Sequence, residues 1–355
     1  MRDSIEQLLS NKVSFLADAG PEEDIAISSR IRLARNLAGF PFPVAASPEQ
    51  LGEVCDAVRD AASESGAFGC PECFCFDPEK MSPLDRELLF ERRLASRDFL
   101  ERASGTRLLV SGDEANSVMV NEEDHLRIQA FQPGFRLNAV WETINRIDDE
   151  LGSRLSYAFD DRLGFLTCCP TNVGTGMRAS VMLHLPGLVL SGQIGPTIQG
   201  VNKLNLAVRG IAGEGTDNRG NLFQVSNQST LGESEPQIIE RLNHVISQLI
   251  AHEKSARQLL LQRDQFALLD HVGRAYGTLR HCYRLSSEEA LNSLSLIRFG
   301  VDLGMFTNVN VHIVNELFIA IGAAHLQHAA GHELSAAERD VARAALCRER
   351  LRQAG

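Results

Sequence analysis

The sequence lacks any apolar run that approaches the length of a membrane span, and its N-terminus has acidic residues where a signal peptide has an apolar core. It also lacks an excess of basic residues, because the formal net charge is -11. Binding to nucleic-acid phosphates needs a basic face, so this charge argues against such a partner but leaves room for a local group of arginines. We therefore expect a cytoplasmic protein that binds neither nucleic acid nor a membrane.

The eight cysteines do not form a disulfide framework, since they are scattered and two are adjacent at Cys168 and Cys169. Cys70, Cys73 and Cys75 lie close together, but no second pair or nearby histidine completes the four ligands of a structural zinc site. We expect reduced thiols on a surface loop there, and no metal bound by the protein itself.

Short apolar segments typical of strands precede residue 230, and helical periodicity follows it. The strand candidates are residues 25–28, 117–121, 164–168, 180–185, 204–208 and 222–226. From Ser234 onward apolar residues recur at helical spacing, and serine–glutamine or serine–glutamate pairs typical of capping boxes begin at Ser234, Ser286 and Ser335. The sequence predicts an antiparallel or mixed sheet with covering helices, then an all-helical region, with a boundary near residue 250 inside a long helix.

Two familiar nucleotide-binding patterns are absent from the sequence. It has no G-x-x-x-x-G-K-[ST] motif, and no H-R-D-x-x-x-x-N catalytic loop followed by D-F-G. A protein of this sequence that uses ATP must therefore bind it through other groups, of which arginines are the best candidates.

The segment SSRIRLARN, residues 28–36, places two arginines on one side of an expected strand. Arg30 and Arg32 then share a face, while Ile31 and Leu33 point to the core. Two guanidinium groups side by side can each bind phosphate oxygens in a bidentate manner. Taken alone, the segment is better explained as a solvated basic strand face.

The segment NEEDHLRIQ, residues 121–129, follows the apolar residues of an expected strand. If the strand continues, Glu123, His125 and Arg127 lie on one face. Three adjacent acids are unfavourable unless cations compensate them, so a carboxylate site for a cation is one interpretation and an acidic turn is the other. The residues alone do not decide between them.

Two glycine-rich segments complete the set. In TCCPTNVGTGMRAS, residues 167–180, Gly174 and Gly176 allow close backbone approach to a ligand, between Cys169 and Arg178. Cys168 should point away from Cys169, as an inert buried thiol. In RGIAGEGTDNRGN, residues 209–221, Glu214 lies between two glycines, where it is either a solvated loop acid or a carboxylate that a closing loop delivers to substrate.

Taken together, these four segments resemble the catalytic domain of the phosphagen (guanidino) kinases in order and spacing, over roughly residues 21–250. The chain resembles the bacterial protein-arginine kinases of the McsB type more closely, through NQSTLGESE, LSSEEALNSLSLIRFGVDLG and ERDVARAAL. The resemblance implies an α+β fold, a glutamine-synthetase-like antiparallel sheet with flanking helices, followed by an all-α C-terminal domain. It places an N-terminal extension at 1–20, the catalytic domain at 21–250 and the helical domain at 251–355.

The same resemblance implies a site that binds ATP, with Mg²⁺ carried by the nucleotide, and that contacts the substrate guanidinium through Glu123, Cys169 and Glu214. A guanidinium is a poor nucleophile, so a carboxylate must take its proton as the nitrogen attacks; Glu123 is the favoured base and Glu214 its partner. The implied ATP-binding residues are Ser28, Ser29, Arg30, Ile31, Arg32, Arg93, Arg127, Arg178, Ala179, Ser180, Val181, Met182, Arg209, Gly210, Ile211, Ala212 and Gly213.

Two positions depart from the wider family. Arg93 stands in a stretch where the family often has histidine, and Ala212 stands where small-molecule arginine kinases have arginine; the protein-arginine kinases also lack that arginine. Only 27 residues precede Ser28, too few for the helical domain that helps to enclose small substrates in phosphagen kinases. An uncapped site would accept an arginine that is still part of a polypeptide.

The C-terminal segment RDVARA, residues 339–344, matches the phosphoarginine-binding motif of the resembled family. By that match Arg339, Asp340, Arg343 and Ala344 would form an allosteric phosphoarginine site; without it, a solvated helix end would be the better interpretation. The resemblance also implies protein substrates, stress response or protein quality control, an McsA-like activator, a Clp ATPase and a homodimer or higher oligomer. Two alternatives are a kinase of free arginine or another small guanidino compound, and a phosphoarginine-binding pseudokinase adaptor.

Overall fold

The computed structural model describes residues 2–17, 19–68, 73–102, 104–210, 219–307 and 309–353, apart from the side chains of residues 2, 3 and 17. The chain forms two compact units whose segments alternate along the sequence. Unit 1 comprises Met1–Pro21, Ser28–Val181 and Ser226–His244, and unit 2 comprises Glu22–Ile27, Met182–Val225 and Val245–Gly355. Because the units interleave, they do not test a domain boundary near residue 250, which stays a prediction.

Eight strands form one sheet in the order β2-β3-β4-β5-β1-β8-β10-β9, to which both units contribute residues. The β1–β5, β2–β3, β3–β4 and β4–β5 pairs are antiparallel. The strands are β1 (Ala26–Arg35), β2 (Phe74–Phe76), β3 (Arg107–Val110), β4 (Asn116–Val120), β5 (Leu126–Pro133), β8 (Met177–His184), β9 (Leu206–Gly210) and β10 (Leu222–Asn227). A separate hairpin pairs β6 (Phe159–Asp160) with β7 (Gly164–Phe165).

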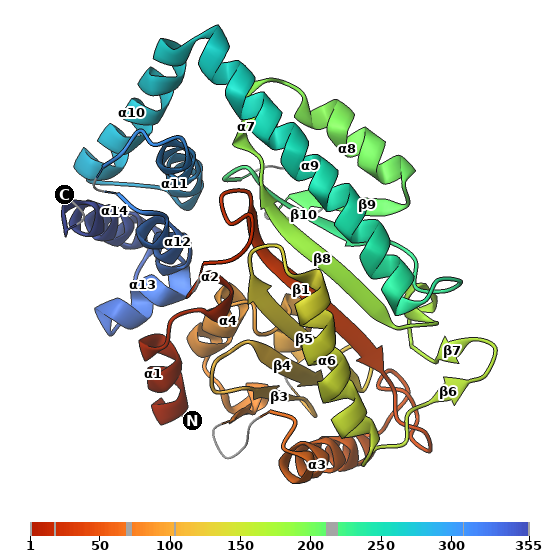
Figure 1. Ribbon diagram of the computed structural model, residues 1–355. Coiled ribbons are helices and arrows are strands. Elements are labelled where there is room, and N and C mark those ends of the chain that lie inside the picture. The colour runs from red at the N-terminus through yellow and green to blue at the C-terminus, as the bar shows by residue number, and fades with distance from the viewer. Residues whose placement is uncertain are drawn as a thin grey trace. The chain divides into compact units, whose positions relative to one another are not determined.

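Helices flank the strands of unit 1, and α6 packs along β5 (Figure 1). The helical elements of this unit are α1 (Arg2–Ser10), α2 (Ser14–Ala17), α3 (Pro48–Ser65), α4 (Pro83–Glu91), α5 (Arg97–Arg102), α6 (Leu137–Gly152) and the 3-10 turns η1 (Pro78–Lys80) and η2 (Pro170–Asn172). The predicted strand at 25–28 is the start of the longer β1. Sequence patterns did not reveal β2, β3, β5 and β6.

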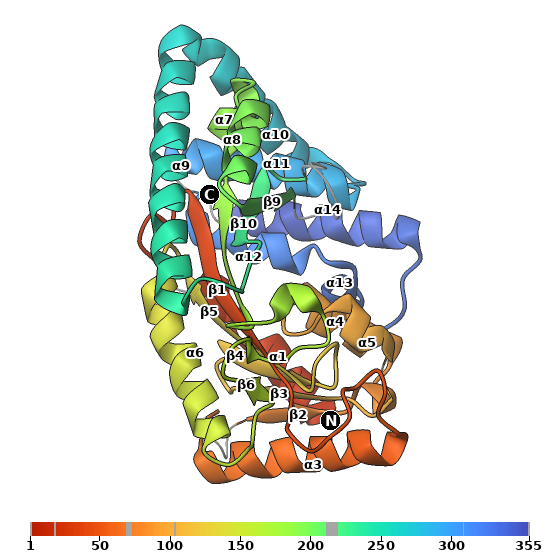
Figure 2. The ribbon, with the colours of Figure 1, turned by 90° about the vertical axis from the view of Figure 1, so that its right-hand side faces the viewer.

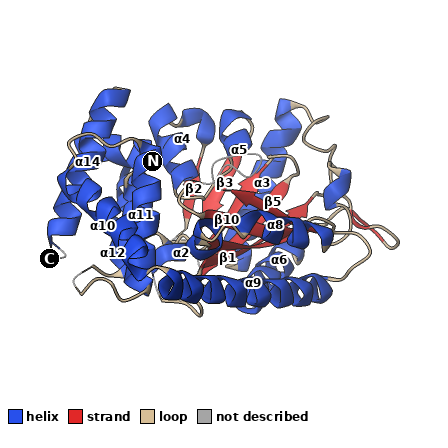
Figure 3. Ribbon diagram, turned by 90° about the horizontal axis from the view of Figure 1, so that it is seen from above, coloured by secondary structure: helices blue, strands red, loops and turns tan. Residues whose placement is uncertain are grey.

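All the elements described after β10 are helices, blue in Figure 3. They are α9 (Glu235–Arg263), α10 (Gln265–His281), α11 (Ser287–Asp302), α12 (Val311–Ala320), α13 (Ala323–Ala330) and α14 (Ala336–Gln353); unit 2 also contains α7 (Pro186–Leu190) and α8 (Ile194–Lys203). Residues of α9 belong to both units, and the helix runs without a break (Figure 2). This confirms the predicted long helix around residue 250.

The three predicted capping boxes are formed to different extents. The Ser286 hydroxyl accepts the Glu289 N–H at 3.2 Å at the start of α11. At α14 the Ser335 hydroxyl accepts the Glu338 N–H at 3.3 Å, and the Glu338 carboxylate accepts the Ser335 N–H at 2.8 Å, which is a complete capping box. Before α9, the Ser234 N–H donates to the Gln237 side chain at 2.8 Å.

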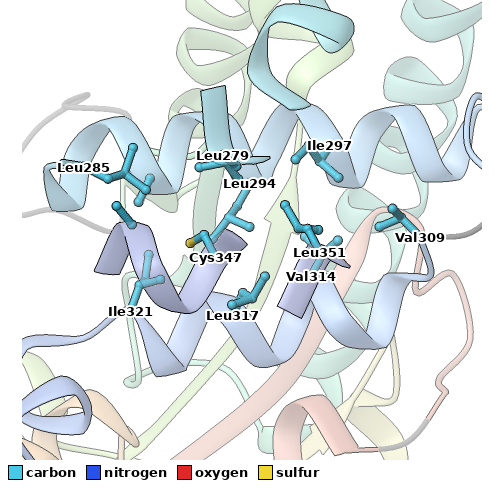
Figure 4. Close-up of a cluster of buried hydrophobic side chains, with 12 residues drawn as sticks. Leu279, Leu285, Leu294, Ile297, Val309, Val314, Leu317, Ile321, Cys347 and Leu351 are labelled. Carbon is cyan, nitrogen blue, oxygen red and sulfur yellow. The ribbon is translucent and has the colours of Figure 1, made fainter. Parts of the chain in front are cut away.

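The helices of unit 2 have an apolar core of their own (Figure 4). Its buried members come from α10, α11, α12, α14 and the segments between them: Leu279, Leu285, Ala290, Leu294, Ile297, Val309, Val314, Leu317, Ile321, Ala344, Cys347 and Leu351. These side chains are removed from water within a single chain. The apolar periodicity after residue 255 therefore does not require a second subunit to explain it.

Candidate active site

The β1–β5 register brings basic side chains of two strands to one face of the sheet. Arg30 lies opposite Phe131, Arg32 opposite Gln129, and Ala34 opposite Arg127. Directly opposed residues of an antiparallel pair point to the same face, so Arg30, Arg32 and Arg127 share a face. Ile31 and Leu33, which point the other way, are 0% exposed. The alternation predicted for residues 28–36 is confirmed.

Four arginines of unit 1 lie close enough to perturb one another electrostatically. The pKa of Arg30 is lowered to about 9, first by burial and then by the positive charges of Arg93, Arg127 and Arg178. The pKa of Arg127 is lowered to about 10 by burial and then by Arg178. Like charges gathered in a partly desolvated place are unfavourable, so a polyanion that binds there gains strong electrostatic stabilisation.

Arg32 adds a feature that fits the same ligand. Its Nε atom is buried, and no hydrogen-bond partner for it is found within the described residues. A buried donor without a partner costs free energy, which a ligand oxygen can recover. An oxygen-rich anion such as a triphosphate therefore fits this face of the sheet.

Arg93 reaches the cluster from the chain that follows α4. It has a φ of +60°, a left-handed conformation that is rare for residues with side chains. The buried Gln129 amide fixes this bend by donating to the carbonyls of Arg93 and Leu94, both at 3.0 Å. The adjacent Arg92 instead forms a buried ion pair with Glu114 at 2.8 Å. One of the two neighbouring arginines therefore supports the fold, and the other joins the charged cluster.

The acidic segment after β4 is a turn, which corrects the expectation of a continuing strand. β4 ends at Val120, Asn121 has a φ of +62°, and the chain returns as β5 from Leu126. The Asn121 N–H donates to the His125 carbonyl at 2.9 Å, closing the turn. Glu123, His125 and Arg127 therefore do not form one strand face.

The three acids of this turn have separate environments. Glu122 is buried, pairs with Arg127 and accepts a hydrogen bond from Ser96, and burial raises its pKa to about 7. Asp124 is also buried and accepts hydrogen bonds within the protein. Glu123 alone is exposed, and no hydrogen bond or ion pair of its carboxylate is found in the described part of the chain. It is the acid of this turn that can receive a substrate.

Asp124 joins this turn to the segment that carries Cys169. Its Oδ1 accepts the Asn36 side-chain N–H at 2.6 Å and the backbone N–H of Cys168 at 2.7 Å. The hydrogen bond between Asp124 and the Cys168 N–H therefore links the residue that follows Glu123 to the residue that precedes Cys169. The charge of Glu123 also contributes to raising the pKa of Cys168, which confirms that the two segments lie close together.

The two adjacent cysteines differ in their chemistry. Burial, followed by the charges of Asp124 and Glu123, raises the pKa of Cys168 to about 12, so this side chain stays a thiol near neutral pH. That agrees with the inert role expected for Cys168, although its side chain is only partly buried. The Cys169 sulfur lies 3.0 Å from the Thr171 hydroxyl and is partly exposed.

Several residues expected to bind ATP have side chains that the fold uses. The Ser29 hydroxyl donates to the Gly134 carbonyl and accepts the Arg136 N–H, both at 2.9 Å, and the Ser180 hydroxyl donates to the Arg30 carbonyl at 3.4 Å. The side chains that are buried are those of Ser28, Ser29, Ile31, Ala179, Ser180, Val181 and Met182. At these strands it is the arginines that offer side chains to a ligand.

The remaining predicted residues of the glycine-rich loop lie apart from this description. Arg209 is exposed on β9 in unit 2, followed by Gly210 at the end of that strand. Ile211, Ala212, Gly213 and Glu214 lie outside the described residues. The roles given to these residues stay predictions.

In the C-terminal motif, Arg343 is engaged within the protein. It is buried, donates to the carbonyls of Ile321 at 3.0 Å and Leu285 at 2.8 Å, and pairs with Asp340 at 2.6 Å. Arg339 is partly exposed and donates to the Leu334 carbonyl at 2.8 Å. Ala344 is fully buried. The assignment of all four residues to a phosphoarginine site stays a prediction.

Cys73 forms a disulfide, which corrects the expectation of reduced thiols throughout this cysteine cluster. Cys75 is a free thiol, and Cys70 lies outside the described residues. Within the described residues no group of three or more histidine, cysteine or acidic side chains could hold a metal ion. A search of the same residues finds no helix long and apolar enough to span a membrane.

Comparison with known families agrees with this geometry. The family model for the ATP:guanido phosphotransferase C-terminal catalytic domain matches residues 54–256, and that for the protein-arginine kinase McsB C-terminal domain matches residues 265–355. The chain belongs to the protein-arginine kinases of the ATP:guanido phosphotransferase family. It is therefore a phosphotransferase enzyme of this family, with ATP as the phosphoryl donor that the family name states. The whole of β1, with its arginines, lies before the matched catalytic range.

Individual relatives support this assignment over nearly the whole chain. The protein-arginine kinase of Halothermothrix orenii is 44% identical over 349 residues, 98% of this chain and 99% of that protein. The protein-arginine kinase of Bacillus subtilis is 45% identical over 338 residues, 95% of this chain and 93% of that protein.

Solved structures of guanidino kinases share the fold. A lombricine kinase has a TM-score of 0.56 at 24% identity, covering 69% of this chain and 71% of that chain. A duplicated taurocyamine kinase from Schistosoma mansoni with bound transition-state-analogue components has a TM-score of 0.59 at 23% identity, covering 79% of this chain and 41% of that chain. The predicted antiparallel sheet with flanking helices is thereby confirmed.

Sequence patterns missed the residues that position the site. Asp124 and Gln129 stand inside the acidic segment that the sequence singled out, but only the structure shows that they hold Cys168 and Arg93. Gln129 is a polar residue among the apolar residues of β5, which suggests that its side chain is paired, and Asp124 is one of three adjacent acids in the preceding turn. Neither position indicates which group the side chain binds.

Proposed function

We propose that this protein transfers the γ-phosphoryl group of ATP to arginine side chains of proteins, giving N-phospho-L-arginine and ADP. The observation that carries the proposal is the cluster of Arg30, Arg93, Arg127 and Arg178 in unit 1, whose mutual repulsion a polyphosphate would relieve. The names of the relatives support arginine within proteins as the acceptor.

In this proposal the arginine cluster binds the triphosphate. Arg32 adds a buried donor. The resemblance to guanidino kinases alone suggests Arg209 as a further cation for the phosphates. Mg²⁺ bound to the nucleotide would neutralise charge on the β- and γ-phosphates as transfer proceeds. Since phosphoryl transfer needs mainly positioning and charge stabilisation, fixed guanidinium groups are well suited to it.

The exposed Glu123 and the partly exposed Cys169 would receive the substrate guanidinium. Glu123 accepts a proton from the attacking nitrogen, the nitrogen–phosphorus bond forms, and the bond between the γ-phosphorus and the bridging oxygen breaks to release ADP. Glu214 would be the second carboxylate that orients the guanidinium. Cys169 would lie against the same group, where a thiolate would be stabilised by its positive charge.

The wider setting is part of the proposal. We place the protein in the cytoplasm, in protein quality control or stress response, with an McsA-like activator and a Clp ATPase as partners. The region 251–355 would form the dimer or higher oligomer and bind phosphoarginine through the 339–344 motif.

Incubation with Mg-ATP and either free arginine or an unfolded protein tests the activity. We expect an acid-labile phosphoramidate on the protein. Product on free arginine alone would show a small-molecule guanidino kinase, and product on neither would favour a phosphoarginine-binding adaptor.

The assignment of the base is tested separately with Glu123→Gln. We expect its kcat to fall at least about 100-fold, because general base catalysis is removed, while binding of Mg-ADP persists. The matched control is Asp161→Asn, which alters an exposed acid of the same unit. An active Glu123→Gln enzyme would refute the role of Glu123.

A further inference from the structure

Two buried polar residues after β10 have no role in the site described so far. Asn227 is 1% exposed and Thr230 is 5% exposed. Both belong to unit 1, together with the segment from Cys169 to Arg178. Buried polar side chains are retained where they hold something in place, so the groups that they bind are informative.

Asn227 holds the backbone on both sides of Arg178. Its side-chain oxygen accepts the Ala179 N–H at 2.8 Å, and its side-chain nitrogen donates to the Met177 carbonyl at 2.9 Å. These two backbone groups point to the same edge of β8, because groups two residues apart along a strand face the same way. The side-chain amide therefore takes the place of a peptide group of a neighbouring strand, at the position that orients Arg178.

Thr230 holds the turn that follows Cys169. Its hydroxyl lies 2.7 Å from the Val173 carbonyl and 2.9 Å from the Thr171 carbonyl. Both carbonyls are thus within hydrogen-bond distance of its single proton. Its own carbonyl accepts the Thr175 N–H at 3.0 Å. Gly174, with a φ of +109°, packs so closely on this carbonyl that a Cβ there would collide with it.

The turn that Thr230 holds also contacts the sulfur of Cys169. Thr171, whose carbonyl Thr230 binds, also places its hydroxyl 3.0 Å from the Cys169 sulfur. One four-residue segment thus fixes the turn near the cysteine and the strand at the arginine. The spacing between those two groups sets how a guanidinium and a phosphate could meet.

We infer that Asn227 and Thr230 are positioning residues of the phosphoryl-transfer site, Asn227 for the phosphate-binding Arg178 and Thr230 for Cys169. The inference rests on the proposed function for the roles of Arg178 and Cys169. Asn227 should act mainly on nucleotide binding, and Thr230 mainly on the environment of the thiol and on turnover.

The test compares four variants of the full-length protein: Asn227→Ala, Thr230→Val, Thr230→Ser and the control Gln228→Ala, which alters an exposed side chain of the same segment. Calorimetry measures the Kd for Mg-ADP, and peptide mass spectrometry follows alkylation of Cys169 by iodoacetamide. We expect Asn227→Ala to raise the Kd at least tenfold. Thr230→Val should change the alkylation rate at least threefold and lower kcat, with the Kd within twofold of the wild type. Thr230→Ser should restore both.

Kd and alkylation values within twofold of wild type in the folded Asn227→Ala and Thr230→Val proteins would overturn the inference, as would equal changes in Gln228→Ala. If Asn227→Ala does not fold, Asn227→Asp decides, since it keeps the acceptor for Ala179 and loses the donor to Met177: tenfold weaker binding supports the inference and unchanged binding refutes it. Neither readout requires arginine phosphorylation. A wild type that binds Mg-ADP but phosphorylates no arginine would refute the proposed function alone, and a wild type that binds no Mg-ADP would refute both.

Discussion

Arginines that are wholly or partly removed from water occur in both units of the molecule, in two different electrostatic environments. In unit 2, Arg298 pairs with Asp302 at 3.4 Å and donates to the Asp24 carbonyl at 2.9 Å and the Asn315 side chain at 3.2 Å. In unit 1, the charges that most affect Arg30 are those of other arginines. Arg298 is thus surrounded by acceptors of the protein itself, whereas Arg30 lies among other guanidinium groups, one of which, Arg127, also pairs with Glu122.

The difference separates arginines that support the fold from arginines that serve a ligand. A buried guanidinium is tolerated when carboxylates and carbonyls surround it, and removing it then leaves those partners uncompensated. Where guanidinium groups repel one another, removing one should relieve the folded state and impair binding instead. Substitutions of Arg298 and of Arg30 should therefore have opposite consequences for stability and activity.

The largest effect is expected for Arg30→Ala in unit 1. Its kcat/KM should fall at least about 1000-fold, because an arginine that stabilises the charge of phosphoryl transfer contributes about that much. The free energy of unfolding should stay within about 1 kcal/mol of wild type, since a repulsive charge is removed. Steady-state kinetics and urea unfolding check both parts, with Arg154→Ala, an exposed arginine paired with Glu64, as the control. Loss of stability with retained activity would contradict the comparison.

The next effect is on stability, for Arg298→Met in unit 2. The free energy of unfolding should fall by about 3–5 kcal/mol, because the carbonyls that Arg298 binds lose their partner and the buried Asp302 loses one of its two arginines, keeping Arg257 at 3.4 Å. Urea unfolding of the variant against wild type measures it. A loss below about 1 kcal/mol would show that the site can do without this guanidinium, and the contrast between the units would then fail.

The sequence predicted these two regions unequally well. The alternation of Arg30, Ile31, Arg32 and Leu33 is a local property of one strand, so it could be predicted from the residues alone. The turn at Asn121 could not, because a left-handed residue other than glycine leaves a weak signal and the apolar pattern favoured a longer strand.

Contacts between distant segments were beyond the sequence patterns. Arg93 joins the cluster only because Gln129, 36 residues away, fixes its carbonyl. Asn227 and Thr230 bind backbone groups about 50 residues earlier in the chain, and backbone groups carry no sequence signal. The family resemblance supplied residue roles that local physics left open, but it did not show which side chains hold the catalytic groups in place.

A third prediction concerns His184, which is fully buried beside Arg298 and hydrogen-bonds to Ser295 at 2.8 Å. Burial, then the charges of Arg298 and Arg257, lowers its pKa well below the ordinary value of 6.5. The His184 imidazole therefore binds a proton near pH 6.5 in the unfolded chain but stays neutral at this pH in the folded protein. The stability contributed by neutral His184 is present above pH 6.5 and is lost as the pH falls.

Urea unfolding of wild type and His184→Gln between pH 7.5 and 5.5 isolates this contribution. The comparison is needed because burial raises the pKa of the nearby Asp302 to about 6, and its titration acts in the opposite direction over the same range. Wild type should lose about 1 kcal/mol more than the variant on acidification, close to one proton per molecule below pH 6.5. Parallel pH profiles of the two proteins would show that His184 carries no such linkage.

The smallest effect is expected for Lys254→Ala, which removes an exposed ion pair of α9 with Glu22 in the same unit as Arg298. Both side chains are partly exposed, at 47% and 38%, so water screens their attraction and the loss of rotamer freedom offsets much of it. The free energy of unfolding should change by less than about 1 kcal/mol, and the change should shrink further in high salt. Urea unfolding at low and high ionic strength measures both. A loss as large as that of Arg298→Met would show that an exposed ion pair stabilises the fold as much as a buried one. Burial would then not explain the importance of Arg298.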